Sequence, residues 1–158
     1  MNRGTACWLP AMAVVLACTP SAPARTSQGP EFLSGPDSAM NSLPFSEAVR
    51  AGDLLFVSGQ LGNVPGKLEL VPGGIVPEAT QTLENVKAVL ERHGASMDAV
   101  VKCTVFLADI KEWPAFNTVY RGFFTARFPA RSAFASNGLA LGARVELDCT
   151  AYAPQARP

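Results

Sequence analysis

The chain has 158 residues, of which 13 are Lys or Arg and 13 are Asp or Glu, so its formal net charge is zero. A neutral chain without basic runs lacks the electrostatic footprint of a nucleic-acid-binding protein, which argues against a nucleic-acid partner. Its four cysteines and single histidine are not spaced as metal ligands, so no metal site is expected.

The N-terminal segment has the features of an export signal. Residues 5–17 are uncharged and mostly apolar, a stretch too short to span a membrane but typical of a signal peptide, which we place at residues 1–17. Residues 15–18 (VLAC) are similar to a bacterial lipobox, in which Cys18 would be lipidated. Cleavage after Ala24 is the alternative. Both predict an exported protein, either periplasmic or a lipoprotein anchored to a bacterial membrane.

Residues 18–43 are rich in Pro, Ser, Ala and Gly. Such a segment buries too little apolar surface to order itself, so it predicts a flexible tether. The remainder, residues 44–154, has the size of one domain with a single core. A domain of this size would gain stability from forming an oligomer.

The domain opens with two predicted strands, residues 45–50 and 54–58, joined by a turn. Residues 54–57 are all apolar, which predicts a strand covered on both faces. Residues 67–71 could add a short strand in the loop that follows.

A helix is predicted to begin at Pro77, because proline loses no hydrogen bond in the first turn, and to end before Gly94. Four apolar residues at steps of four, three and four form one buried stripe along it: Ala79, Leu83, Val86 and Leu90. His93, in the last turn, is expected to be solvated and to suit the helix dipole.

Residues 100–107 predict a strand with alternate apolar residues on one face, namely Val101, Cys103, Val105 and Leu107. A second helix is predicted from residues 111–114 to about Arg127. Its apolar stripe is interpreted as core packing rather than as an aromatic binding site, and consists of Phe116, Val119, Tyr120 and Phe123.

Residues 131–136 and 143–152 could pair as a hairpin across the turn at residues 138–142. In the simplest register Arg131 and Glu146 would share one face as near neighbours. An arginine beside a carboxylate can bind an anionic small molecule and hold a water against it. A salt bridge at a sheet edge is the alternative.

Cys103 and Cys149 both fall on apolar strand faces, where a buried free thiol is the expected state. A disulfide between them is the alternative in an oxidising compartment.

Taken in order, the elements predict an α+β fold with both helices on one face of a mixed sheet, because strand–helix–strand units cross over right-handed. The opposite face carries polar side chains. It suits either a solvated sheet or a subunit interface that encloses polar sites.

Seven runs in this order resemble the RidA/YjgF family of reactive enamine/imine deaminases across essentially the whole predicted domain. They are PFSEAV (44–49), GDLLFVSGQ (52–60), TLENV (82–86), VKCTVFL (101–107), NTVY (117–120), FPARS (128–132) and VEL (145–147).

The resemblance implies a chorismate-mutase-like fold that assembles as a homotrimer, with sites in the clefts between subunits. It also implies hydrolysis of 2-imino acids, or their enamine tautomers, to 2-oxo acids and ammonia, with no metal or cofactor. Two other functions are weighed. One is a non-catalytic module on the same fold, which would bind small carboxylates or protect unfolded proteins. The other is a ribonuclease, which the neutral charge disfavours.

By the same resemblance, Arg131 matches the arginine that binds the substrate carboxylate, and Glu146 the glutamate that positions or activates the attacking water. Gly59 matches a backbone contact in the cleft, and Asn117 a nearby polar residue. Two further substrate-binding positions depart from the family pattern: Phe45 replaces a tyrosine, and Ala133 replaces a cysteine.

Overall fold

The computed structural model describes residues 29–36 and 41–155. The predicted signal peptide, Cys18 and the first part of the predicted tether lie outside the described residues. Within the described ranges, no helix combines the length and the apolar character needed to cross a membrane.

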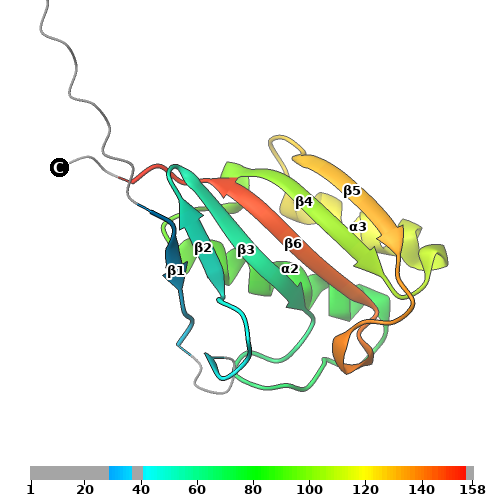
Figure 1. Ribbon diagram of the computed structural model, residues 1–158. Coiled ribbons are helices and arrows are strands. Elements are labelled where there is room, and N and C mark those ends of the chain that lie inside the picture. The colour runs from blue at the N-terminus through cyan, green and yellow to red at the C-terminus, as the bar shows by residue number, and fades with distance from the viewer. Residues whose placement is uncertain (1–28, 37–40, 156–158) are drawn as a thin grey trace, which may run out of the picture.

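The fold has two layers, a mixed six-stranded sheet and a pair of helices that cover one of its faces (Figure 1). The strand order across the sheet is β1-β2-β3-β6-β4-β5. The strands are β1 (Glu31–Leu33), β2 (Ala48–Ala51), β3 (Leu54–Leu61), β4 (Val100–Leu107), β5 (Ala130–Ala135) and β6 (Val145–Tyr152). The helices are α2 (Ile75–Arg92) and α3 (Trp113–Phe123). This arrangement confirms the predicted α+β fold class with both helices on one face.

Strand β1 lies inside the segment that was predicted to be a tether. It pairs antiparallel with β2, and Leu33 packs against the core. Arg50 of β2 reaches across to the Glu31 carboxylate, 3.9 Å away. The tether prediction is therefore wrong for residues 31–33, because pairing with an edge strand supplies the order that the local composition lacks.

Helix α2 begins at Ile75, two residues before the predicted Pro77. Its predicted apolar stripe is fully buried against the sheet, as the spacing required. The chain leaves the helix through Gly94, whose φ of 76° suits a residue without a side chain.

His93 is not solvated as predicted. Its Nε2 lies 2.8 Å from a Glu47 carboxylate oxygen, and its side chain is 10% exposed. Its backbone carbonyl accepts a hydrogen bond from Arg50. His93 therefore joins the end of α2 to β2, a tertiary contact that its position at the helix end did not reveal.

Strand β3 was predicted to be covered on both faces. In the single chain it alternates instead: Leu55 and Val57 are buried against the helices, whereas Leu54 and Phe56 are 37% and 43% exposed. The face of the sheet away from the helices, called the open face below, therefore carries apolar side chains that a single chain leaves uncovered.

Strand β4 spans the predicted residues, but its register shifts between Val100 and Lys102. The shift buries Val100 and leaves Val101 45% exposed, so the predicted apolar face is wrong at Val101. In the loop after β3, the predicted strand at residues 67–71 is reduced to one isolated bridge between Asn63 and Leu70.

The predicted hairpin of the last two strands is wrong. Strand β5 pairs parallel with β4 at the edge of the sheet, and β6 lies between β3 and β4, antiparallel to both. The connection between β5 and β6 passes the end of β4, where the Ser136 N–H donates to the Leu107 carbonyl. A central place suits β6, because its alternate apolar residues are all buried: Val145, Leu147, Cys149 and Ala151.

Helix α3 follows a 3₁₀ turn at Ile110–Glu112 and ends at Phe123, four residues before the predicted end. Phe116 and Tyr120 are buried in the core, as predicted.

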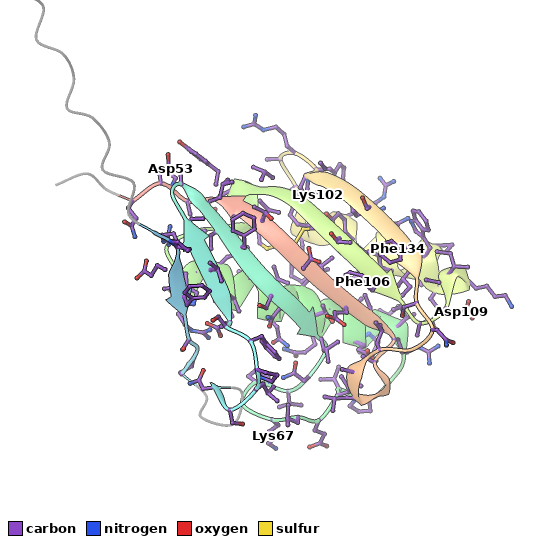
Figure 2. The ribbon with its side chains drawn as sticks, viewed as in Figure 1. Asp53, Lys67, Lys102, Phe106, Asp109 and Phe134 are labelled. Atoms are coloured by element: carbon purple, nitrogen blue, oxygen red, sulfur yellow. A yellow bond between two sulfur atoms is a disulfide. The ribbon has the colours of Figure 1, made fainter. Side chains whose placement is uncertain are left out.

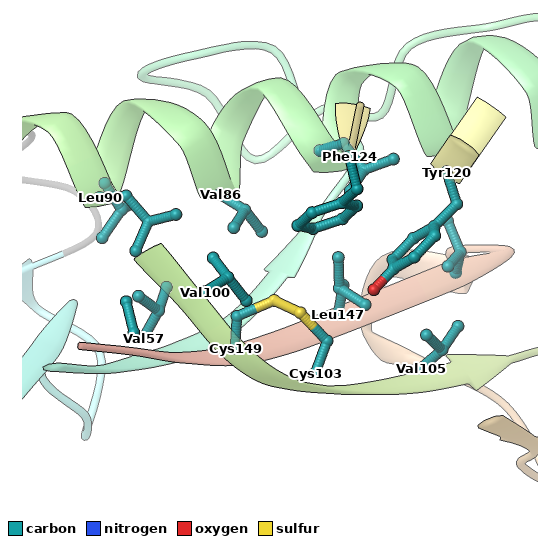
Figure 3. Close-up of a cluster of buried hydrophobic side chains, with 14 of the residues drawn as sticks. Val57, Val86, Leu90, Val100, Cys103, Val105, Tyr120, Phe124, Leu147 and Cys149 are labelled. Carbon is teal, nitrogen blue, oxygen red and sulfur yellow. A yellow bond between two sulfur atoms is a disulfide. The ribbon is translucent and has the colours of Figure 1, made fainter. Parts of the chain in front are cut away.

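Cys103 and Cys149 form a disulfide, and the expectation of free thiols is wrong (Figure 3). The two residues are register partners on β4 and β6, with a Cα separation of 4.2 Å. Directly opposed residues of a non-hydrogen-bonded antiparallel pair lie this close, so the pairing itself brings the two sulfurs together. The bond lies in the core between the sheet and the two helices.

Candidate active site

Arg131 lies on β5 with its side chain on the helix face of the sheet. Its register partner on β4 is the buried Cys103. The guanidinium carbon lies 4.6 Å from the centre of the Tyr120 ring and 5.9 Å from the centres of the Trp113 and Phe116 rings, all of α3. Three aromatic side chains of one helix therefore surround the guanidinium.

The Arg131 guanidinium has no hydrogen-bond or ion-pair partner among the described residues. All of its N–H donors are therefore free to bind an anion. A planar guanidinium can bind a carboxylate through two parallel hydrogen bonds. This is the group in the structure best suited to recognise a small carboxylate.

Glu146 lies near the start of β6, on the open face. Its register partners are Leu61 of β3 and Phe106 of β4. Burial raises the pKa of the Glu146 carboxyl, and the negative charge of Asp148 on the same face raises it further. A carboxylate with a raised pKa is a stronger base, which suits proton transfer near neutral pH.

Gly59 provides the space that the Glu146 carboxylate occupies. The pairing of β3 with β6 is irregular between Val57 and Gln60, which brings Gly59 close to β6. A Cβ atom on Gly59 would lie 2.0 Å from a Glu146 carboxylate oxygen, a distance that no real Cβ contact allows. Glycine is therefore required here for the carboxylate to keep its position. The resemblance implied only that the backbone of Gly59 makes a contact in the cleft.

The structure does not bring Arg131 and Glu146 together within one chain. Arg131 points to the helix face, whereas Glu146 points to the open face between the buried residues Val145 and Leu147. The prediction that they share one face is wrong, because it depended on the hairpin register. β5 instead pairs with β4, which aligns Arg131 with the core residue Cys103.

Two of the other predicted site residues lie on the side of the sheet that carries Arg131, and the third lies elsewhere. Ala133 follows Arg131 on the same face of β5 and packs against the core, and Asn117 lies beside Phe116 on α3. The side-chain oxygen of Asn117 is buried without a hydrogen-bond partner in the described part of the chain. Phe45 is half exposed and lines a pocket with Gln60 and with Asn85 and Arg92 of α2, and neither Glu146 nor Gly59 lines this pocket, so the structure does not place Phe45 beside Glu146.

We call Arg131, Asn117 and Ala133 the arginine half, and Glu146 and Gly59 the glutamate half. No group of three or more His, Cys, Asp and Glu side chains suited to a metal ion occurs among the residues that the structure describes.

The sequence model of a family described as endoribonuclease L-PSP matches residues 37–153. The chain belongs to this family, the RidA/YjgF family. The match spans all of the domain except β1, and it includes every residue of both halves.

Curated RidA/YjgF relatives carry several names. A goat (Capra hircus) protein, 44% identical over 108 residues, is named 2-iminobutanoate/2-iminopropanoate deaminase, and the alignment covers 68% of this chain and 79% of that protein. The human protein of the same name is 39% identical over 108 residues, with the same coverage of both chains. Protein DfrA of Myxococcus xanthus is 40% identical over 110 residues, covering 68% of this chain and 84% of its own.

Solved structures with similar sequences share the fold. YEO7 of yeast is 37% identical with a TM-score of 0.70, and the match covers 82% of this chain and all of that one. Escherichia coli TdcF with bound serine is 31% identical with a TM-score of 0.66, covering 70% of this chain and 88% of that one.

Sequence reasoning missed the aromatic surroundings of Arg131. The spacing of Phe116 and Tyr120 identified them as core residues, which is correct, but it did not place Arg131 against them. The signal that could have done so is the strand–helix–strand unit of β4, α3 and β5. A right-handed crossover makes β5 parallel and adjacent to β4, beneath the connecting helix.

Proposed function

We propose that this RidA/YjgF protein hydrolyses reactive 2-imino acids, or their enamine tautomers, to 2-oxo acids and ammonia. The observation that carries the proposal is the Arg131 guanidinium, which has no anionic partner among the described residues and is surrounded by aromatic rings. Relatives about 40% identical to this chain are named for this activity. The zero net charge disfavours the nucleic-acid substrate that the family description suggests.

We further propose that each site forms between two copies of the chain. The arginine half and the glutamate half face opposite sides of the sheet, so one site can contain both only if the arginine half of one copy meets the glutamate half of another. Contacts between two different surfaces close into a ring rather than a two-fold dimer. A homotrimer, as the family resemblance implies, is the simplest such ring.

The open face has the character of a surface that a partner would cover. Phe106 and Phe134 pack edge to face on it, with ring centres 4.9 Å apart, and Phe134 remains 46% exposed (Figure 2). Phe56 is also exposed there. Aromatic side chains are enriched at protein–protein interfaces, and Phe106 is the register partner of Glu146, so a partner that covered this face would also cover the carboxylate.

In the proposed reaction, Arg131 binds the substrate carboxylate and thereby orients the adjacent imine carbon. Glu146 accepts a proton from a water molecule as the water oxygen forms a bond to the carbon of the protonated imine and the C=N π electrons move to nitrogen. Glu146 then returns this proton to the nitrogen of the carbinolamine, and the carbon–nitrogen bond breaks to release ammonia. The hydroxyl proton passes to Glu146 as the C=O bond forms, and from there to solvent. The products are a 2-oxo acid and ammonia. An imine is already electrophilic, so orientation and general-base catalysis suffice, the latter contributing roughly 10²–10⁴ in rate.

Arg131→Ala should lower kcat/KM for imine hydrolysis at least about a hundredfold, because carboxylate binding and orientation are lost together. Arg131→Lys, the matched control, keeps the charge but not the planar pair of donors, and it should lose most of the activity as well. An amino-acid oxidase would generate 2-iminopropanoate or 2-iminobutanoate in situ, and semicarbazide would trap the imine that survives.

Imine loss no faster with wild-type protein than with Arg131→Ala would contradict the proposed activity. Binding of 2-oxobutanoate by wild-type protein without turnover would instead identify a carboxylate-binding module on the same fold.

Asp148→Asn should shift the acid limb of the pH–activity profile to lower pH. The Asp148 charge raises the pKa of Glu146, so its removal lowers that pKa and leaves Glu146 ionised in more acidic solution. Activity that depends on the carboxylate then persists to lower pH. The measurement is kcat/KM against pH for wild type and variant, and an acid limb that stays in place would argue against Glu146 as the base.

We also propose that the protein acts outside the cytosol. The predicted leader suggests export, and the Cys103–Cys149 disulfide supports it, because such bonds persist in oxidising compartments.

A further inference from the structure

The position of Arg131 raises the question of what holds its guanidinium in one orientation. Arginines that bind anions are often oriented by a carboxylate of the same protein. Three other arginines of the fold have such partners: Arg50 pairs with Glu31, Arg92 with Glu47, and Arg144 with Glu112. Arg131 has no acidic partner in the part of the chain that the structure describes.

The nearest group to the Arg131 guanidinium in this cluster is the ring of Tyr120, 4.6 Å from its carbon to the ring centre. This distance is within the range of a cation–π contact. The ring is itself fixed, because Tyr120 is 3% exposed and packs between Phe116 and Phe124, with ring centres 5.6 and 4.6 Å away.

Tyr120 interacts with Arg131 through its ring rather than through an ionised hydroxyl. Burial raises the pKa of Tyr120 to about 12, although the positive charge of Arg131 acts in the opposite direction. The phenol is therefore neutral at physiological pH. Its hydroxyl is also buried without a hydrogen-bond partner among the described residues, so the hydroxyl is not used to hold the arginine.

We infer that Tyr120 is a positioning residue: its ring holds the Arg131 guanidinium in the orientation that binds the substrate carboxylate. This inference rests on the proposed function, since it assigns Tyr120 a part in that same site. Trp113 and Phe116, each 5.9 Å from the guanidinium carbon, complete the aromatic surroundings.

An aromatic ring suits this task better than an acidic side chain would. A carboxylate of the protein would occupy the same N–H donors that the substrate needs and would neutralise the positive charge that attracts it. A ring face attracts the cation without accepting those N–H bonds. The arginine is thus oriented while its donors and its charge remain available to the ligand.

Tyr120→Leu should raise KM for 2-iminobutanoate about tenfold, with a smaller change in kcat, because a disordered arginine binds the carboxylate less well. The dissociation constant of the product 2-oxobutanoate, measured by calorimetry, should rise by a similar factor. Tyr120→Phe keeps the ring and removes only the unpaired hydroxyl, so it should restore both values to within about twofold of wild type.

Leu90→Ala is the control for a purely structural effect. Leu90 of α2 is fully buried in the same core but lies at the far end of the cluster from Tyr120, and has no described contact with Tyr120 or Arg131 (Figure 3). Both variants should lose stability, on the order of 10 °C in Tm, but only Tyr120→Leu should raise KM. An equal rise in KM for both variants, or no rise for Tyr120→Leu, would overturn the positioning role.

A second readout does not depend on catalysis. In ¹H–¹⁵N NMR spectra, the Arg131 Nε–H signal should be shifted by the ring currents of the aromatic cluster in wild type and Tyr120→Phe, and the shift should collapse in Tyr120→Leu. If wild type hydrolyses no imine, the proposed function fails, while this signal still decides whether Tyr120 orders Arg131. An Arg131 Nε–H chemical shift that is the same in Tyr120→Leu as in wild type would by itself contradict the inference.

Discussion

A mixture of the Arg131→Ala and Glu146→Gln variants should recover about a quarter of wild-type imine hydrolysis, although each variant alone is nearly inactive. In a ring of identical chains, each site takes its arginine half from one chain and its glutamate half from the next. With random assembly at equal amounts, about one site in four receives both an intact arginine and an intact glutamate. The two variants would be co-expressed with different tags, and mixed assemblies would be purified through both tags. This purification removes the inactive assemblies of a single variant, so in purified mixed trimers the expected recovery rises to about one site in three.

The matched control mixes wild type with the double variant Arg131→Ala/Glu146→Gln. Sites between chains predict about a quarter of wild-type activity at equal amounts, whereas sites within one chain predict about a half. Glu146→Gln should not harm folding, because the raised pKa of Glu146 means that its ionised form is less favourable in the folded chain than in the unfolded one. No recovery in verified mixed assemblies would exclude a site shared between chains.

Reduction of the Cys103–Cys149 bond should lower the free energy of unfolding by about 2–4 kcal/mol, and Tm by on the order of 10 °C. The bond joins residues 46 apart in sequence, so it restricts a large loop of the unfolded chain. Its removal also loosens the contact between β4 and β6, two central strands of the sheet.

The measurement is thermal or urea unfolding with and without reductant, at one protein concentration, because assembly makes the midpoint depend on concentration. The double variant Cys103→Ala/Cys149→Ala should be insensitive to reductant, which separates the loss of the bond from other effects. Two free thiols found by alkylation of the protein from its native compartment would contradict both the bond and the proposed export.

Sequence reasoning placed most of the elements that carry the site. Period-two and helical spacing located β4, β6 and α2 within two residues or fewer of their observed ends. The spacing of apolar residues along one element can be recognised without knowing which element covers it. It failed where the outcome depended on a partner distant in sequence. Residues 31–33 form strand β1 because they pair with β2. Val101 is exposed rather than buried because the pairing of β4 with β6 shifts its register at that point.

The amino-acid sequence by itself supplied the candidate groups of the site: an arginine on one predicted strand, a glutamate on another and, through the family resemblance, the glycine after a third. Which of these groups meet was decided only by the tertiary structure. Hydrogen bonding placed β6 between β3 and β4 and β5 beside β4, so Arg131 and Glu146 point to opposite faces. Strand pairing is a long-range choice, and a shift of partner or register turns a side chain to the other face of a sheet.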